Sequence, residues 1–184
     1  MSFTEIQPEL DLTPQRARQT DDAGLCILVV EDDDADAYLI ERALLGNADI
    51  GGILRATDGV EALALVDSGA VEPDLVLIDL QMPRKDGFHL LVDFAVRRQP
   101  CFPMVVLTSS TAPTDAMRSR LRGAVRVLTK PDSLEELETL LSATITATRT
   151  GITLSRRRAA MPKRRVTFDN AQPPGRRRGP DLTI

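Results

Sequence analysis

The stretch Pro73–Gly87, PDLVLIDLQMPRKDG, decides the fold of this chain. Its apolar run, residues 75–80, lies between Pro73 and Pro83 and is interrupted by one carboxylate, Asp79. A short apolar run bounded in this way is typical of a strand buried on both faces of a parallel sheet. Ligands bind at the carboxyl edge of such sheets, so we expect Asp79 to belong to a functional site there. The alternative is that Asp79 only caps the following loop.

Short apolar runs alternate with amphipathic stretches along the rest of the chain. The runs predict five strands, at residues 25–30, 53–57, 75–80, 104–107 and 124–129. The stretches predict five helices, at residues 35–45, 60–66, 88–98, 112–121 and 134–148. Repeated strand–helix units form a parallel sheet with helices on both faces and right-handed crossovers. The sequence therefore predicts an α/β fold with a doubly wound parallel sheet.

Polar residues follow four of the predicted strands. Glu31 and Asp32 follow the first strand, Asp79 ends the third, Thr108 follows the fourth and Lys130 follows the fifth. Because the carboxyl ends of parallel strands share one edge, we expect these residues to converge on one cleft. Helix capping is the alternative explanation for the acids after the first strand. It does not explain why two of them directly abut a buried strand.

The predicted cleft holds chemistry that suits a phosphoryl group. Three carboxylates in one cleft repel each other, and a divalent cation among them would make the arrangement tolerable. Oxygen ligands without His or Cys favour Mg²⁺. Lys130 adds a positive charge and Thr108 a hydroxyl donor, which together suit a transient dianion. The implied reaction is phosphoryl transfer to Asp79, which is already ionised at pH 7 and needs no general base.

Four motifs occur in order along the chain: LVVEDD, LVLIDLQMPRKDG, VVLTSS and VLTKP. With these motifs, residues 25–148 resemble the receiver domain of two-component response regulators, the CheY-like family, here of the single-domain type. Each motif alone is weak, but all four at this spacing are specific. The resemblance implies a flavodoxin-like (βα)5 fold with strand order 2-1-3-4-5. In that order Cys26 and Cys101 lie too far apart to form a disulfide.

The resemblance also implies which residues carry the reaction. Asp79 would accept a phosphoryl group from a sensor histidine kinase or a phosphotransfer protein. The ligands of Mg²⁺ would be Glu31, Asp32, Asp79 and the backbone carbonyl of Gln81. Glu31 would bind the ion either directly or through a water molecule. The chain would then catalyse only its own phosphorylation and dephosphorylation, and would turn over no metabolite.

Four further positions follow from the resemblance. Thr108 and Lys130 would contact the phosphoryl group, while Gln81 and Ser110 would tune dephosphorylation. One position departs from the family pattern: many members have Tyr or Phe three residues before the lysine, where this chain has Val127. The departure puts the usual aromatic switch in doubt, although not phosphorylation itself. Val127 is alternatively an ordinary strand residue.

Composition divides the chain into three parts. Residues 1–24 lack sustained periodicity and predict a flexible arm, and residues 149–184 form a basic tail that we expect to be disordered. Between them, residues 25–148 are the part that resembles a receiver domain. The tail contains ten basic and two acidic residues, a net charge of +8, whereas residues 1–148 contain 13 basic and 25 acidic residues, a net charge of −12. The tail is an inert appendage, an arm that binds nucleic acid or an anionic surface, or a docking segment.

Several functions remain open at this point. The leading hypothesis is a response regulator that signals through phosphorylation-dependent protein interaction, with pairing of two copies through helix four, strand five and helix five. A phosphatase with Asp79 as its nucleophile would typically have an acid two residues later, where this chain has Gln81. A degenerate receiver that only binds partners would have lost a pocket residue. A polyanion-binding adaptor would act through the basic tail.

The remaining features are mostly exclusions. No run of about 18 apolar residues predicts a membrane span, and the acidic N-terminus does not resemble a secretory signal, so the sequence predicts a cytoplasmic protein. Without a CxxC motif or a Cys/His cluster, no zinc site is expected, and Cys26 and Cys101 are predicted to be small buried hydrophobes. His89, the sole histidine, is predicted to be a solvated helix residue rather than a phosphodonor or base.

Overall fold

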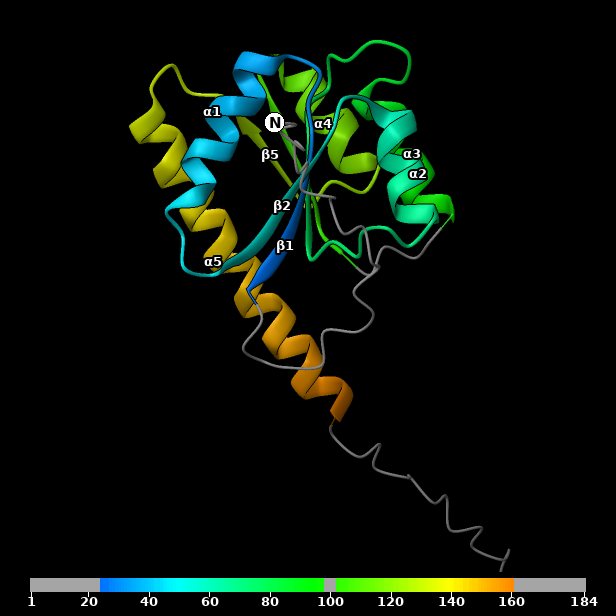
Figure 1. Ribbon diagram of the computed structural model, residues 1–184. Helices are drawn as coiled ribbons and strands as arrows, with labels where there is room; N and C mark the ends of the chain where they lie inside the picture. The colour runs from blue at the N-terminus through cyan, green and yellow to red at the C-terminus, as the bar shows by residue number, and fades with distance from the viewer. Residues whose placement is uncertain (1–23, 98–101, 161–184) are drawn as a thin grey trace, which may run out of the picture.

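The chain folds into one parallel sheet with helices on both faces (Figure 1). The computed structural model describes residues 24–97 and 102–160. Strands and helices alternate through this part of the chain, and the sheet has the strand order β2-β1-β3-β4-β5. Every pair of neighbouring strands is parallel. The structure thereby confirms the flavodoxin-like fold and the strand order that the sequence predicts.

The strands lie close to their predicted positions. They are β1 (Leu25–Val30), β2 (Ile50–Ala56), β3 (Leu75–Ile78), β4 (Met104–Thr108) and β5 (Arg126–Thr129). β3 and β4 are buried along their whole length, as expected of central strands covered on both faces. β2 begins earlier than predicted, because the paired glycines near its start do not prevent it from joining β1. β3 ends at Ile78, so Asp79 is the first residue beyond the strand.

The helices are α1 (Asp34–Leu45), α2 (Gly59–Asp67), α3 (Gly87–Arg97), α4 (Pro113–Leu121) and α5 (Leu134–Ala160). An aspartate is the N-cap residue of two of these helices, α1 and α2. The Asp33 carboxylate accepts hydrogen bonds from the backbone N–H groups of Ala35 and Asp36, and Asp58 caps α2 in the same way. Helix capping therefore accounts for Asp33, the third acid of its run, and leaves Glu31 and Asp32 available for another role.

Two apolar layers hold the helices against the sheet. One face of the sheet packs against α1 and α5, with Ile40, Leu141 and Ile145 among its buried residues. The other face packs mainly against α2 and α3, with Leu63 and Leu91 in its core. Because helices cover both faces, only the edges of the sheet remain open to ligands. The site is therefore expected at the carboxyl edge.

Helix α5 is longer than the sequence predicts. It continues past the predicted end at Thr148 to Ala160, and Figure 1 shows its last turns extending beyond the sheet. Arg149 forms an ion pair with Asp49, which precedes β2. No proline occurs between Pro131 and Pro162, and the helix continues through Gly151, which is the glycine nearest to Thr148. The first part of the predicted tail is therefore helical.

Some predictions concern parts of the chain that the structure does not describe. The arm at residues 1–23, the tail from residue 161 onward and Cys101 lie outside the described residues. The prediction that Cys26 and Cys101 are not bridged is therefore untested. Within residues 24–97 and 102–160, no helix is long and apolar enough to cross a membrane.

Candidate functional site

Three carboxylates gather at the carboxyl edge of the sheet. Glu31 and Asp32 follow β1 and Asp79 follows β3, which is the neighbour of β1. Backbone hydrogen bonds continue the sheet past the strand ends, from the Glu31 N–H to the Ala56 carbonyl and from the Asp79 N–H to the Val30 carbonyl, both 3.0 Å. Carboxylate oxygens of the three acids lie within 4.8 Å of one another. The sheet thus brings together the three acids that the sequence places at its strand ends.

Lys130 reaches into this acid cluster from the end of β5. Its Nζ lies 2.7 Å from Glu31 Oε2, 2.6 Å from Asp36 Oδ2 and 3.4 Å from Asp79 Oδ1. Glu31 and Asp79 are buried, whereas Asp32 is the most exposed acid of the cluster. The three N–H donors of one ammonium group therefore face three different carboxylates. Lys130 is placed beside the predicted phosphoacceptor, as the sequence suggests.

The environment shifts the pKa of both Glu31 and Lys130. Burial raises the pKa of Glu31, even though the hydrogen bond and the charge of Lys130 lower it. Burial acts to lower the pKa of Lys130, but the hydrogen bonds to Asp36 and Glu31, helped by the charge of Asp79, outweigh it and raise that pKa. The lysine consequently stays positively charged at neutral pH, as an electrostatic role toward phosphoryl oxygens requires.

The loop after β3 holds the Asp79 carboxylate from a second side. The backbone N–H of Gln81 donates a hydrogen bond of 2.6 Å to Asp79 Oδ2. The loop then returns so closely that a Cβ atom on Gly87 would lie 2.2 Å from the Asp79 carbonyl oxygen. Only glycine fits there, which explains the glycine at the end of the motif. The Gln81 side chain is exposed, so its predicted role in dephosphorylation stays a prediction.

The same loop is attached to the start of α2. Arg84 adopts the left-handed backbone conformation, with φ of 61°, and forms an ion pair with the buried Asp58. The Gly59 N–H also donates to the Lys85 carbonyl over 3.4 Å. Two separate contacts thus hold the Asp79 loop against the start of α2.

Thr108 and Ser110 lie at the end of β4. Thr108 is buried, and its Oγ1 accepts a hydrogen bond of 3.2 Å from the backbone N–H of Ser110. The Ser110 hydroxyl donates over 2.7 Å to Asp115, in the first turn of α4. Thr108 is therefore at the predicted edge, while Ser110 is engaged with α4. The phosphoryl contact of Thr108 and the dephosphorylation role of Ser110 stay predictions.

The surroundings of Val127, His89 and Cys26 give these three residues no place in the acid cluster. Val127 pairs with Val106 across the sheet and packs, partly buried, against the core, which fits an ordinary strand residue. His89 is an exposed helix residue whose Nδ1 lies 2.8 Å from Asp86 Oδ1, as expected of a solvated histidine. Cys26 is only partly buried against the core, less than the sequence predicts.

The structure adds two residues to the site, Asp36 and Arg55, that were not identified from the sequence. Asp36, in the first turn of α1, shares the Lys130 ammonium with Glu31. Arg55, near the end of β2, contacts the backbone of the acid loop. A signal for Asp36 exists, since the first turn of α1 starts at the predicted cleft. No local pattern marks Arg55, because its contacts depend on how β2 pairs with β1.

The residues present fit a divalent cation of the Mg²⁺ type. The donors in the cluster are all carboxylate oxygens, without His or Cys. Asp36 adds a fourth carboxylate near the cluster. Among the described residues, Lys130 is the only lysine whose ammonium group contacts these carboxylates. The resulting excess of negative charge would attract a cation, and the mutual repulsion of the carboxylates is costly without one.

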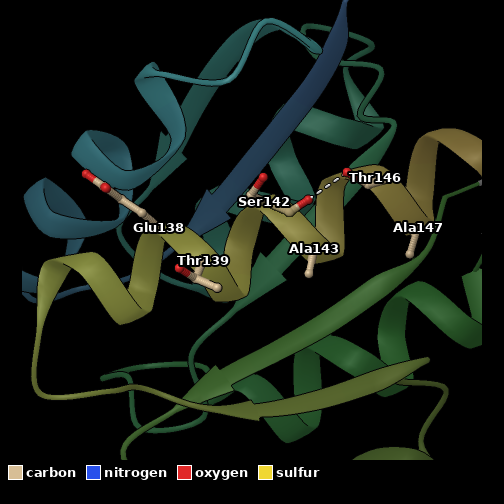
Figure 2. Close-up of a pocket in the computed structure, with 6 residues that line it drawn as sticks. All are labelled: Glu138, Thr139, Ser142, Ala143, Thr146 and Ala147. Atoms are coloured by element: carbon tan, nitrogen blue, oxygen red, sulfur yellow. Dashed lines mark hydrogen bonds between the residues drawn. The ribbon is translucent and has the colours of Figure 1, made fainter.

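A separate open hollow runs along α5, away from the acid cluster. Figure 2 shows that short side chains of this single helix line most of it. The lining residues are Glu138, Thr139, Ser142, Ala143, Thr146 and Ala147. The Thr146 hydroxyl is already used, since it donates over 3.0 Å to the Ser142 carbonyl. The hollow contains none of the predicted site residues.

Comparison with known proteins agrees with this geometry. The family of response regulator receiver domains matches residues 27–142. The sensor histidine kinase CheAY of Helicobacter pylori is 30% identical over 150 residues, which cover 79% of this chain and 18% of that protein. The transcriptional regulatory protein TcrA of Mycobacterium tuberculosis is 37% identical over 122 residues, 66% of this chain and 46% of TcrA. The matched parts thus span less than half the length of either relative.

Solved structures show the same likeness. The phosphorylated cyanobacterial phytochrome response regulator RcpA is 30% identical, with a TM-score of 0.61, and the match covers 66% of this chain and 91% of RcpA. The Mn²⁺-bound form of response regulator Rcp1 is 29% identical, with a TM-score of 0.59, and the match covers 65% of this chain and 90% of Rcp1. The acid cluster, the sheet order and the matched residues lead to one conclusion: this chain belongs to the response regulator receiver-domain family of two-component signalling.

Proposed function

We propose that Asp79 is the phosphoacceptor of this receiver domain and that it is phosphorylated in a Mg²⁺-dependent reaction. The donor would be a phosphohistidine of a sensor kinase or phosphotransfer protein. One observation carries the proposal: the Asp79 carboxylate lies beside Glu31 and Asp32, with the Lys130 ammonium 3.4 Å from Asp79 Oδ1. The carboxylate proposed as nucleophile, the acids that could hold a cation and the Lys130 ammonium thus lie together, which supports the proposal.

The chain's own residues support the transfer in separate ways. The Gln81 N–H orients the Asp79 carboxylate, whose oxygen forms the new bond to phosphorus while the bond from phosphorus to the donor nitrogen breaks. Lys130 offsets the negative charge on the phosphoryl oxygens. When bound, Mg²⁺ supplies further positive charge, and Glu31, Asp32, Asp79 and the Gln81 carbonyl would hold it. The Thr108 hydroxyl would donate a hydrogen bond to the phosphoryl group.

The downstream steps belong to the same proposal. The phosphorylated receiver domain would signal through a phosphorylation-dependent interaction with a protein target. Gln81 and Ser110 would set how long the signal lasts. Ser110 supports such a role, because its backbone N–H donates to the Thr108 hydroxyl and its own hydroxyl donates to Asp115 at the start of α4. A change at Thr108 would thereby reach α4.

The test is phosphorylation of the full chain by a small donor. Acetyl phosphate or phosphoramidate with Mg²⁺ should add one phosphoryl group, measured by intact mass, and hydroxylamine should remove it as it does other acyl phosphates. Asp79→Asn should not accept the group, while Asp132→Asn, which changes an exposed aspartate just after Lys130, should. A wild-type chain that stays unmodified, or an Asp79→Asn variant labelled on the same peptide, would show the assignment to be wrong.

A further inference from the structure

We propose that Arg55 is a positioning residue for the metal pocket. Its guanidinium holds the backbone of the loop that carries Glu31 and Asp32, and so sets their carboxylates for a divalent cation. The inference rests on the proposed cation site, and it adds a residue from β2 that takes no part in the chemistry itself.

Arg55 makes three hydrogen bonds, two to the segment between β1 and α1 and one to the first residue of α1. Its Nε donates to the Glu31 carbonyl over 3.0 Å, and its Nη2 donates to the Asp32 carbonyl over 3.1 Å. Its Nη1 donates to Asp34 Oδ1 over 2.7 Å. Each nitrogen of the guanidinium thus has its own acceptor. A planar fork with its nitrogens engaged fixes a loop better than a single flexible ammonium could.

The contacts leave the predicted metal ligands free. Arg55 binds Glu31 and Asp32 through their backbone carbonyls and not through their carboxylates. The carboxylate that it does bind, Asp34, is outside the acid cluster and has a side chain 92% exposed. Arg55 therefore restrains the loop without competing with a cation for its ligands. This is how residues beyond the ligands orient a metal site.

The sheet explains how a residue of β2 reaches this loop. Arg55 pairs with Val29 of β1, two residues before Glu31, and the Glu31 N–H donates to the carbonyl of Ala56. The Arg55 side chain then crosses the end of β1 and is only 23% exposed. Partial shielding from water strengthens its charge-assisted hydrogen bonds.

Two roles for Arg55 predict opposite results. If its charge were what mattered, a neutral replacement would remove repulsion and tighten cation binding. If it positions the loop, a neutral replacement must weaken binding, because the carboxylates would have to be ordered when the cation binds. Lysine separates the roles further, since it keeps the charge and loses the fork.

The experiment titrates the full chain with Mn²⁺, followed by electron paramagnetic resonance of the free ion. Arg55→Met should weaken Mn²⁺ binding by about tenfold or more, the usual effect of losing a partner beyond the ligands. Arg55→Lys should also weaken it, by less. Arg42→Met, which removes the same charge from the exposed surface of α1, should bind like the wild type. Amide exchange without metal should be faster at residues 32–36 in Arg55→Met.

Each outcome decides the matter. Arg55 variants that bind Mn²⁺ as tightly as the wild type, or more tightly, overturn the positioning role while the cation site stands. If Arg55→Met does not fold, Arg55→Lys carries the test alone, and wild-type affinity in that variant overturns the role. If the wild type does not bind Mn²⁺, or Asp32→Ala binds it equally well, the cation site falls and the role of Arg55 falls with it.

Discussion

Removal of Lys130 tests the electrostatics of the acid cluster directly. Lys130→Met is expected to lower the free energy of unfolding at pH 7 when no divalent cation is present. The substitution leaves the Glu31 and Asp79 side chains, 3% and 6% exposed, without the ammonium that compensates them. Methionine keeps most of the apolar stem, so the change is mainly one of charge.

The size of the loss follows from burial. Breaking a buried ion pair by removing one partner costs about 3–5 kcal/mol. We expect a value near the lower end, about 3 kcal/mol, because the Lys130 side chain is 13% exposed and water can replace part of its contacts. With a urea m-value of about 1.5–2 kcal/mol/M, the unfolding midpoint should fall by about 1.5–2 M.

The loss should depend on pH with a definite sign. Burial and the charge of Asp79 raise the pKa of Glu31, and Lys130 opposes both, so the pKa should rise further in the variant. A carboxyl whose pKa is raised in the folded state destabilises the fold once the pH exceeds its ordinary value. At lower pH both states are protonated and the penalty vanishes. The variant should therefore recover stability, relative to the wild type, as the pH falls from the raised pKa of Glu31 to the ordinary pKa of a glutamate, and the recovery should be complete below that ordinary value.

The assay is urea unfolding in EDTA, followed by far-ultraviolet circular dichroism because the chain has no tryptophan. Lys85→Met is the matched control: it removes another lysine paired with an aspartate, Asp93, at a more exposed place, and should cost less than about 1 kcal/mol. Excess Mg²⁺ should restore much of the stability of Lys130→Met. An unchanged midpoint at pH 7, or a loss that grows on acidification, would refute the reasoning.

Three further substitutions test other parts of the structure. Gly87→Ala places a Cβ atom 2.2 Å from the Asp79 carbonyl and should destabilise the fold by about 1–3 kcal/mol, measured by urea unfolding. Leu141→Ala, at a side chain of α5 that is 1% exposed, should cost about 2–5 kcal/mol and leave Mn²⁺ affinity unchanged. Arg149→Met should cost less than about 1 kcal/mol, because its pair with Asp49 lies at the surface.

The order of the elements and the place of Asp79 could be predicted because both are encoded locally. Apolar runs between turn residues identify buried strands, and the alternation of strands and helices leaves a parallel sheet as the consistent arrangement. In such a sheet the strand ends share an edge, so Glu31, Asp79 and Lys130 could be placed at one edge of the sheet although they are distant in the sequence. The flavodoxin-like strand order came from the family resemblance.

The tertiary structure alone decided which groups touch. Asp36 binds Lys130 because the first turn of α1 starts at the pocket, and Arg55 binds the acid loop because β2 pairs with β1 in one register. The last part of α5, after Thr148, was also not predicted from the sequence. The lack of a proline there permits a helix, but it is not a positive signal for one. Local pattern determines where a strand ends, whereas a side-chain contact depends on the relative placement of two elements, which only packing of the whole domain settles.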